Sequence, residues 1–189
     1  DENTGNGLHP GAGSTNVLFE RCAGTGNGRS GFFFCVRANH ITVRDCSFRD
    51  NALGISLGTR DCYNLIEYCR MEGNRGAGVL VRQTPKPTEV HSCRVQKCQI
   101  KGNARVEGQV EVTSDARDLV FVENEVGGER DKPGVFVEQT ARSIYLSDNV
   151  FTDCKVEVEM TSESRAEKAP EIECGYGEWP APVFRHLLA

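Results

Sequence analysis

The segment ITVRDCSFRDN, residues 41–51, alternates apolar and polar side chains, reaches a cysteine and ends on an asparagine. The same pattern returns in VLFERCAGTGN (17–27), NLIEYCRMEGN (64–74) and CRVQKCQIKGN (93–103). Four copies of one short pattern indicate an internal repeat, and periods of roughly 20 to 50 residues are typical of solenoid proteins. The repeat therefore decides the fold class.

The copies share one register. Each asparagine follows its cysteine by five residues, which gives the pairs Cys22 and Asn27, Cys46 and Asn51, Cys69 and Asn74, and Cys98 and Asn103. Two further copies, LVFVENEV and IYLSDNVF, carry Asn124 and Asn149 where the others have cysteine. These six positions are separated by 24, 23, 29, 26 and 25 residues, so the register persists through six copies.

A second unit, a glycine followed by an alternating strand, lies between the copies. It occurs as GLHPG (7–11), GFFFC (31–35), GISLG (54–58), GVLVR (78–82) and GVFVE (134–138), and more loosely as GQVEV (108–112). Alternation with period two predicts a half-buried strand. We expect Leu8, Phe32, Ile55 and Val79 to point inward.

Two repeat architectures fit such a pattern. Leucine-rich repeats need leucine at most apolar positions and a helical segment after each turn, whereas here valine, isoleucine and phenylalanine dominate and a second strand follows. The sequence thus predicts an all-β fold, a right-handed parallel β-helix of six to seven coils spanning residues 1–161. Residues 162–189 are charged and then proline-rich, and we expect a cap or tail there that involves Trp179, Val183, Phe184 and Leu187.

Stacked coils would place the repeated residues above one another. An inward asparagine at a bend can bond the backbone and the asparagine of the next coil, and cysteine is a small side chain that fills a buried corner. The nine cysteines are odd in number and include no C-x2-C pair, so we expect free thiols rather than a disulfide framework or a zinc site.

Composition limits the partners. The net charge of −5 gives no reason to expect nucleic acid, and no run of about 18 apolar residues predicts a membrane span. Residues 1–30 show no basic segment followed by an apolar one, so we predict no signal peptide within this sequence. The thiols mildly favour a reducing compartment.

One outer face carries residues with binding chemistry. Beside the inward residues of the glycine-led strands lie His9, Phe33, Ser56 and Leu80, and beyond them Arg37, Arg60, Asp61 and Arg82. Arginine recognises carboxylates and sulfates in two-point fashion, an exposed phenylalanine can stack on a sugar ring, and histidine has a pKa suited to a base. We predict that Phe33, Arg37, Arg60, Asp61 and Arg82 bind substrate, that the three arginines act together, and that His9 is the catalytic base.

Each of these roles has a structural alternative. In the structural alternative, His9 only bonds a loop backbone, and the arginines are solvated strand residues that pair with Asp61 and with glutamates. Hydrolysis, which needs two carboxylates at a defined separation, is less favoured because only Asp61 borders the early part of the face, with Glu111 and Glu138 further along.

The coils GLHPGAGST, GFFFCVR and GISLGTRD, with their Asn and Cys turns, resemble the right-handed parallel β-helix repeat proteins. That group includes pectate-lyase-like folds and domains shared by carbohydrate-binding proteins and sugar hydrolases. The resemblance covers residues 7 to about 160 and implies a carbohydrate-active or carbohydrate-binding protein with an extracellular or periplasmic location. Together with the arginines it predicts an acidic polysaccharide as partner. Lyase-type elimination is the favoured function, and a non-catalytic module for glycan binding or structural assembly is the alternative. No cofactor is predicted from the residues, and Ca²⁺ is allowed by the resemblance alone. The fold itself does not imply an activity.

Overall fold

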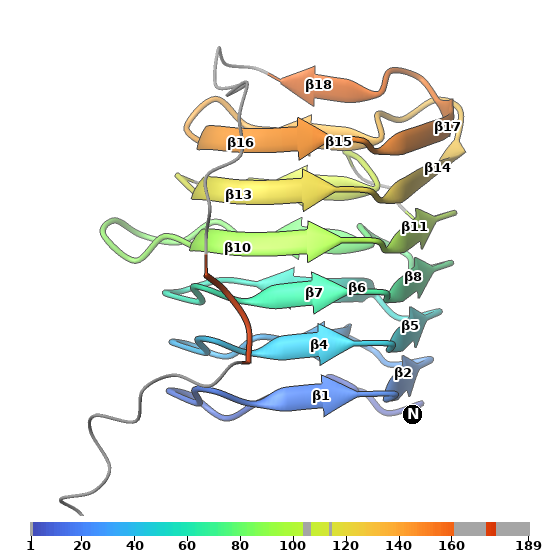
Figure 1. Ribbon diagram of the computed structural model, residues 1–189. Helices are drawn as coiled ribbons and strands as arrows, with labels where there is room; N and C mark the ends of the chain where they lie inside the picture. The colour runs from blue at the N-terminus through green and yellow to red at the C-terminus, as the bar shows by residue number, and fades with distance from the viewer. Residues whose placement is uncertain (1, 104–106, 114, 161–172, 177–189) are drawn as a thin grey trace, which may run out of the picture.

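The computed structural model describes residues 2–103, 107–113, 115–160 and 173–176. Within these residues the chain forms strands, bends and turns and no helix, so no helix there is long and apolar enough to cross a membrane. The strands lie in three parallel sheets of six strands each, stacked along one axis (Figure 1). The predicted all-β parallel β-helix is confirmed.

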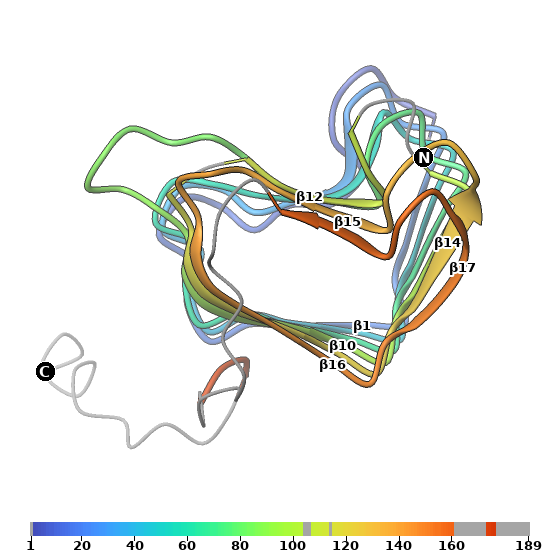
Figure 2. The ribbon, with the colours of Figure 1, turned by 90° about the horizontal axis from the view of Figure 1, so that it is seen from above.

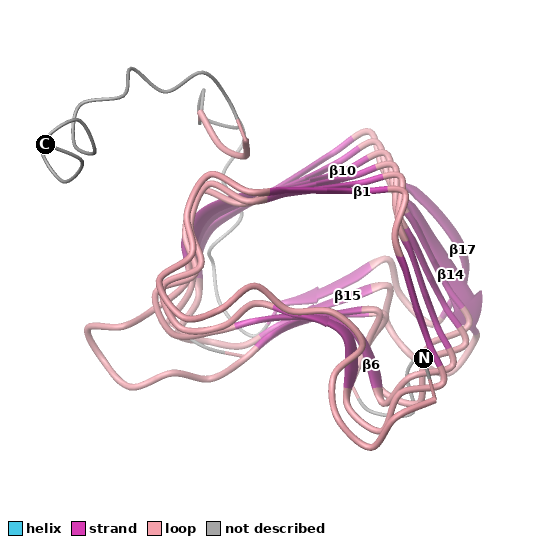
Figure 3. Ribbon diagram, turned by 90° about the horizontal axis from the view of Figure 1, so that it is seen from below, coloured by secondary structure: helices cyan, strands magenta, loops and turns pink. Residues whose placement is uncertain are grey.

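Every coil of the chain visits the three sheets in the same order, so that the cross-section has three sides (Figures 2 and 3). The first sheet contains β1 (Leu18–Glu20), β4 (Thr42–Arg44), β7 (Leu65–Glu67), β10 (His91–Gln96), β13 (Arg117–Val122) and β16 (Arg142–Ser147). The second contains β2 (Ala23–Thr25), β5 (Ser47–Arg49), β8 (Arg70–Glu72), β11 (Gln99–Lys101), β14 (Glu125–Glu129) and β17 (Val150–Cys154). The third contains β3 (Ser30–Phe33), β6 (Leu53–Leu57), β9 (Val79–Val81), β12 (Val110–Val112), β15 (Val135–Val137) and β18 (Val158–Met160).

Neighbouring coils are paired in register. Val43 lies opposite Ile66 in the first sheet, and Ile55 lies opposite Val79 in the third. The inward side chains therefore stack into a continuous core, in which Phe32, Ile55 and Val79 are fully buried as predicted. Leu8, in the first coil, is partly buried and packs against the same core.

The predicted asparagine ladder runs along the corner between the second and third sheets. The side-chain amide of Asn27 donates to Asn51 Oδ1 at 2.8 Å, Asn51 donates to Asn74 at 3.0 Å, and Asn74 donates to Asn103 at 2.7 Å. Each Oδ1 also accepts the backbone N–H of the preceding asparagine, as from Asn27 N at 2.9 Å. These bonds satisfy polar groups that would otherwise be costly to bury.

The ladder explains the glycine at the start of several strands of the third sheet. A Cβ at Gly78 would lie 2.5 Å from Ile100 Cγ2 and 2.8 Å from Asn103 Nδ2, which leaves no space for a side chain. Gly31 meets Asn51 and Phe48 in the same way. The glycine is therefore required by the ladder beside it.

The cysteine ladder occupies the corner between the first and second sheets. Cys46, Cys69 and Cys98 are at most 2 % exposed, and Cys98 N donates to Asn124 Oδ1 at 3.0 Å. Asn124 N in turn donates to Asn149 Oδ1 at 3.0 Å, so the exchange of cysteine for asparagine predicted from the repeat is confirmed. All nine cysteines lie in the described part of the chain, where none forms a disulfide.

Two features depart from the regular coil. Residues 83–90 connect β9 to β10 as a loop that projects from the stack, the green loop in Figure 2, where Lys86 pairs with Asp115 at 3.2 Å. Of the predicted cap or tail, only residues 173–176 belong to the described chain, and they lie against the first sheet. Trp179, Val183, Phe184 and Leu187 lie outside the described residues.

Candidate functional site

The predicted site lies on the outer face of the third sheet. There, equivalent side chains of successive coils lie one above the other and form a column. Phe33 lies opposite Ser56, Ser56 opposite Leu80 and Leu80 opposite Glu111. His9, in the first coil, meets the ring of Phe33 edge to face with 6.3 Å between centroids. His9, Phe33, Ser56 and Leu80 therefore lie in one column as predicted, although Ser56 is fully buried.

Arg82 covers part of this face because its side chain folds back over the preceding coils. Its guanidinium lies 4.1 Å from the centroid of the Phe33 ring. Nη1 donates to Ser56 Oγ at 2.7 Å and Nη2 donates to the carbonyl of Phe34 at 3.2 Å. A guanidinium over an aromatic ring is attracted by the ring's π electrons. Arg82 therefore covers one face of the Phe33 ring, while 25 % of the Arg82 side chain stays exposed.

Asp61 is fully buried beneath Arg82. One carboxylate oxygen accepts the N–H of Ala38 at 3.0 Å, and the other accepts the N–H of Gly58 at 2.7 Å. Arg82 Nη2 lies 3.7 Å from the second oxygen. Burial raises the pKa of Asp61 to about 6, while the two N–H donors and the charge of Arg82 oppose that rise. At neutral pH the carboxylate is ionised.

Arg37 and Arg60 lie at equivalent bends of consecutive coils, at the end of the third sheet. Both residues are exposed and adopt left-handed backbone angles, with φ of 63° and 57°. Arg37 N donates to Thr59 O at 2.9 Å and Arg60 N donates to Thr88 O at 2.9 Å, which fixes each bend to the next coil. Within the described chain neither guanidinium has a carboxylate at ion-pair distance.

His9 is exposed, and its Nδ1 lies 2.6 Å from the carbonyl oxygen of Pro10. A carbonyl only accepts, so Nδ1 carries the proton of this bond and the neutral ring keeps its lone pair on Nε2. The structure therefore brings Phe33, Asp61 and Arg82 into direct contact, links the bends of Arg37 and Arg60 to Asp61 through backbone groups, and places His9 at the edge of Phe33.

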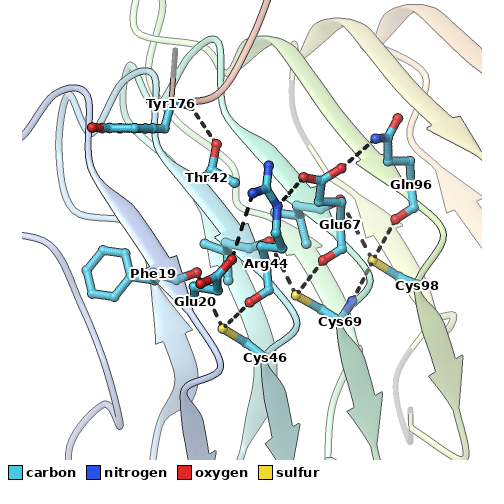
Figure 4. A network of polar contacts seen from close by, with 12 residues as sticks. Phe19, Glu20, Thr42, Arg44, Cys46, Glu67, Cys69, Gln96, Cys98 and Tyr176 are labelled. Carbon is cyan, nitrogen blue, oxygen red and sulfur yellow. Dashed lines mark hydrogen bonds and ion pairs between the residues drawn. The ribbon is translucent and has the colours of Figure 1, made fainter. Parts of the chain in front are cut away.

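A second polar cluster, not anticipated from the sequence, lies on the outer face of the first sheet (Figure 4). Glu67 is 6 % exposed and accepts from Arg44 Nε at 2.7 Å and from Gln96 Nε2 at 2.8 Å. Arg44 also lies 3.8 Å from Glu20. The repeat could have predicted this cluster, because its four polar residues each precede a ladder cysteine by two positions: Glu20, Arg44, Glu67 and Gln96.

Residues 173–176 lie across this same sheet. Gly175 N donates to Tyr63 O at 2.7 Å, and Tyr176 N donates to Thr42 Oγ1 at 2.6 Å, as Figure 4 shows for Tyr176 and Thr42. Gly175 has a φ of +90°, and a Cβ there would lie 2.6 Å from Thr42 Oγ1. Burial raises the pKa of the neighbouring Cys174 thiol to about 11. We call residues 173–176 the strap.

One further hollow lies on the outside of the coils. A hollow of about 390 Å³ beside Tyr68 and Lys97 is bordered by Glu123, which pairs with Lys97 at 3.8 Å. In the described part of the chain no three His, Cys, Asp or Glu side chains are grouped so that they would hold a metal ion. Those residues offer no ligand set for the Ca²⁺ that the resemblance allows.

Comparison with known proteins gives one match. No curated protein and no solved structure matches the chain. The family model described as a right-handed β-helix region matches residues 2–169. Because this match spans most of the chain, and the three stacked parallel sheets have the architecture it describes, the protein belongs to the right-handed β-helix family.

Proposed function

We propose that the outer face of the third sheet, with the bends of Arg37 and Arg60, binds an acidic polysaccharide as a non-catalytic module. The observation that carries the proposal is the pair of exposed guanidinium groups, one coil apart, with no ion-pair partner among the described residues. Like charges on neighbouring strands repel each other, and an anion between them relieves the repulsion.

The spacing of the coils suits a linear glycan. Successive coils are separated by about 4.8 Å, the distance between neighbouring strands, which is comparable with the length of one pyranose unit. A chain of uronic acids or sulfated sugars lying along the stack would present its anionic groups to successive bends. The exposed quarter of Arg82 adds a third cation on the same side.

A second candidate function, elimination on a uronate, is favoured by the geometry of His9. With Nδ1 held by Pro10 O, the lone pair of Nε2 is available to take the proton beside a carboxylate. The electron pair of that C–H bond forms a carbon–carbon double bond, the bond from the neighbouring carbon to its glycosidic oxygen breaks, and the departing oxygen takes a proton from solvent water. Arginine neutralises the carboxylate that makes this proton acidic.

Binding is tested with dextran sulfate, polygalacturonate and neutral dextran, in titrations followed by calorimetry. We expect the two acidic polymers to bind and the neutral one not to bind. In the variant Arg37→Gln/Arg60→Gln affinity should fall by roughly tenfold or more, since contacts of charged groups are worth about 1.5–3 kcal/mol each. Raised salt should weaken binding by the wild type, because exposed charges are screened within about 8–10 Å.

The matched control is Arg70→Gln/Arg75→Gln, which removes two exposed arginines from elsewhere on the coils. Equal loss of affinity in both double variants would mean that net charge alone drives binding, and the proposed face would be wrong. Absence of binding by the wild type would remove the function itself.

Elimination is tested with polygalacturonate by the ultraviolet absorbance of its unsaturated product. If His9 is the base, the wild type forms this product and His9→Ala does not, while both bind the polymer. A wild type that binds without forming product leaves the non-catalytic module as the function.

A further inference from the structure

Asp61 stands at a corner of the coil that other coils fill with small or apolar residues. The registers of Cys62 with His91, His91 with Arg117, and Arg117 with Arg142 define the equivalent positions in later coils. In the preceding coil, Ala38 closes the same turn as Asp61, since Ala38 N donates to Cys35 O at 2.9 Å and Asp61 N donates to Gly58 O at 3.0 Å. The equivalents of Asp61 are thus the buried residues Ala38, Val90, Ala116 and Ala141.

The fold therefore does not need a carboxylate at this corner. The turn that ends at Ala141 is closed by a backbone bond from Ala141 N to Glu138 O at 3.2 Å and has alanine at the position of Asp61. Burying an ionised carboxylate costs free energy unless hydrogen bonds and a counter-charge compensate. A buried acid at a position that alanine fills elsewhere calls for a reason other than coil formation.

Each contact of the Asp61 carboxylate leads to one of the three arginines of the candidate face. Ala38, whose N–H it accepts, directly follows Arg37. Gly58, whose N–H it also accepts, begins the turn that contains Arg60. The third contact, at 3.7 Å, is with the guanidinium of Arg82.

We propose that Asp61 is a positioning residue of this face. Its carboxylate fixes the bends of Arg37 and Arg60 and the guanidinium of Arg82 relative to one another, and so sets the arrangement of cations that meets the polysaccharide. This inference rests on the proposed function, and it assigns to Asp61 no contact with the ligand.

The first test is Asp61→Ala, which gives the corner the residue found in neighbouring coils. We expect affinity for dextran sulfate to fall by roughly tenfold, as for the loss of one charge-assisted contact. Gly58 N–H and Arg82 lose a partner while a buried charge is removed, so the thermal midpoint at pH 7 is measured beside the affinity to show that the variant is folded. Glu138→Gln, which removes a negative charge further along the same face, is the control and should leave affinity unchanged or slightly raised.

The alternative, in which Asp61 is only a negative charge near the site, predicts the opposite sign. Removing such a charge would strengthen the binding of an anion. Affinity that is unchanged or higher in Asp61→Ala would therefore overturn the proposal.

A pH profile gives a second readout that a purely structural role would not change. Besides Arg82, the titratable groups near Asp61 are the thiols of Cys62 and Cys93, and burial raises the pKa of both, that of Cys62 to about 11. Between pH 5 and 8 Asp61 is the group of this set that titrates, and dextran sulfate keeps its charge. Measured in the His9→Ala background, affinity should fall as the pH drops through about 6, and Asp61→Ala should remove this dependence. Affinity that rises on acidification would contradict the proposal.

If the wild type binds none of the acidic polymers, the proposed function fails, and amide hydrogen exchange then decides on Asp61. Faster exchange of the turns 35–38 and 58–61 in Asp61→Ala, with no change in the strands, would support the ordering role. Unchanged exchange in those turns would overturn it.

Discussion

A single side-chain position shows how far residue chemistry can vary without changing the coil. Cys46 accepts the N–H of Cys22 with its sulfur at 3.4 Å, and Asn124 accepts the N–H of Cys98 with its Oδ1 at 3.0 Å. Each side chain also faces a carbonyl of the preceding coil, Cys46 that of Phe19 and Asn124 that of Val95. Cysteine and asparagine are interchangeable here because both fit the corner and use the same two backbone partners.

Cys46 is predicted to tolerate asparagine but not aspartate. Cys46→Asp should lower the free energy of unfolding by about 2–5 kcal/mol, because an ionised carboxylate would be buried with no cation beside it. Cys46→Asn has nearly the same size and should lie within about 1 kcal/mol of the wild type. Chemical denaturation measures both, and equal losses would show that size rather than charge decides at this corner.

In the native protein Cys46 should also resist a polar thiol reagent. Its hydrogen bond with Cys69 and its burial both raise the pKa of the thiol, so little thiolate forms at neutral pH.

The candidate site was harder to predict at this scale. The repeat identified Arg82 and Asp61 as neighbours, yet the backward fold of a long side chain over Phe33 depends on rotamers that no sequence pattern specifies.

At the scale of the strand, alternation and the repeat period were sufficient to predict two strands of each coil and the inward faces of the glycine-led strands. The third strand of each coil, such as β5 after Cys46, was missed because the sequence between cysteine and asparagine was interpreted as a turn. Alternation and the repeat period were also less reliable where a coil is irregular. Gly108 in GQVEV suggested another glycine-led strand, but Val110 pairs with Val79, so Gln109 occupies the position of Gly78. The glycine motif placed this strand one residue out of register. In this coil the side chain of Gln109, rather than an asparagine of the next coil, bonds Asn103.

Gln109 ends the asparagine ladder. Its Oε1 accepts from the side-chain amide of Asn103 at 3.1 Å, and its Nε2 donates to Asn103 O at 2.6 Å. The next coil has no asparagine two residues beyond Gly127, which lies opposite Lys101, because β14 continues to Glu129. A glutamine side chain from the following strand thus fills the place that an asparagine fills elsewhere.

Gln109→Gly is therefore predicted to destabilise the protein although it restores the common glycine. Asn103 would lose the three hydrogen bonds that it makes with the Gln109 side chain, and we expect the free energy of unfolding to fall by about 1–3 kcal/mol. Gln139→Gly, at an exposed turn residue, is the control for the added backbone freedom. A loss no greater than in this control would mean that the ladder does not need its end group.

For the molecule as a whole, stacking makes most contacts local to neighbouring coils, and such solenoids behave approximately as one-dimensional arrays. The strap is an exception, because it joins Tyr176 to Thr42, 134 residues earlier in the chain. The repeat could not predict this contact, since residues 173–176 lie outside it and the strap uses backbone groups. The contact links the end of the chain to the early coils.

Thr42→Val removes the acceptor of the Tyr176 N–H at nearly constant size and should loosen the strap. We expect Cys174 to react faster with a thiol reagent, by roughly the tenfold that corresponds to about 1.4 kcal/mol. Peptide mass mapping separates Cys174 from the other cysteines. Thr15→Val, in an exposed bend of the first coil, serves as control, and equal rates in all three proteins would show that Thr42 does not hold the strap.

The loop 83–90 indicates where this architecture can gain new material. In the coil that contains it, Cys98 follows Cys69 by 29 residues, yet Val79 and Arg94 still pair in register with Ile55 and Leu65 of the preceding coil. The additional residues project from the stack and leave both ladders intact (Figure 2). A foreign peptide inserted at this loop would therefore be displayed at the surface, and the length of one coil can change independently of the others.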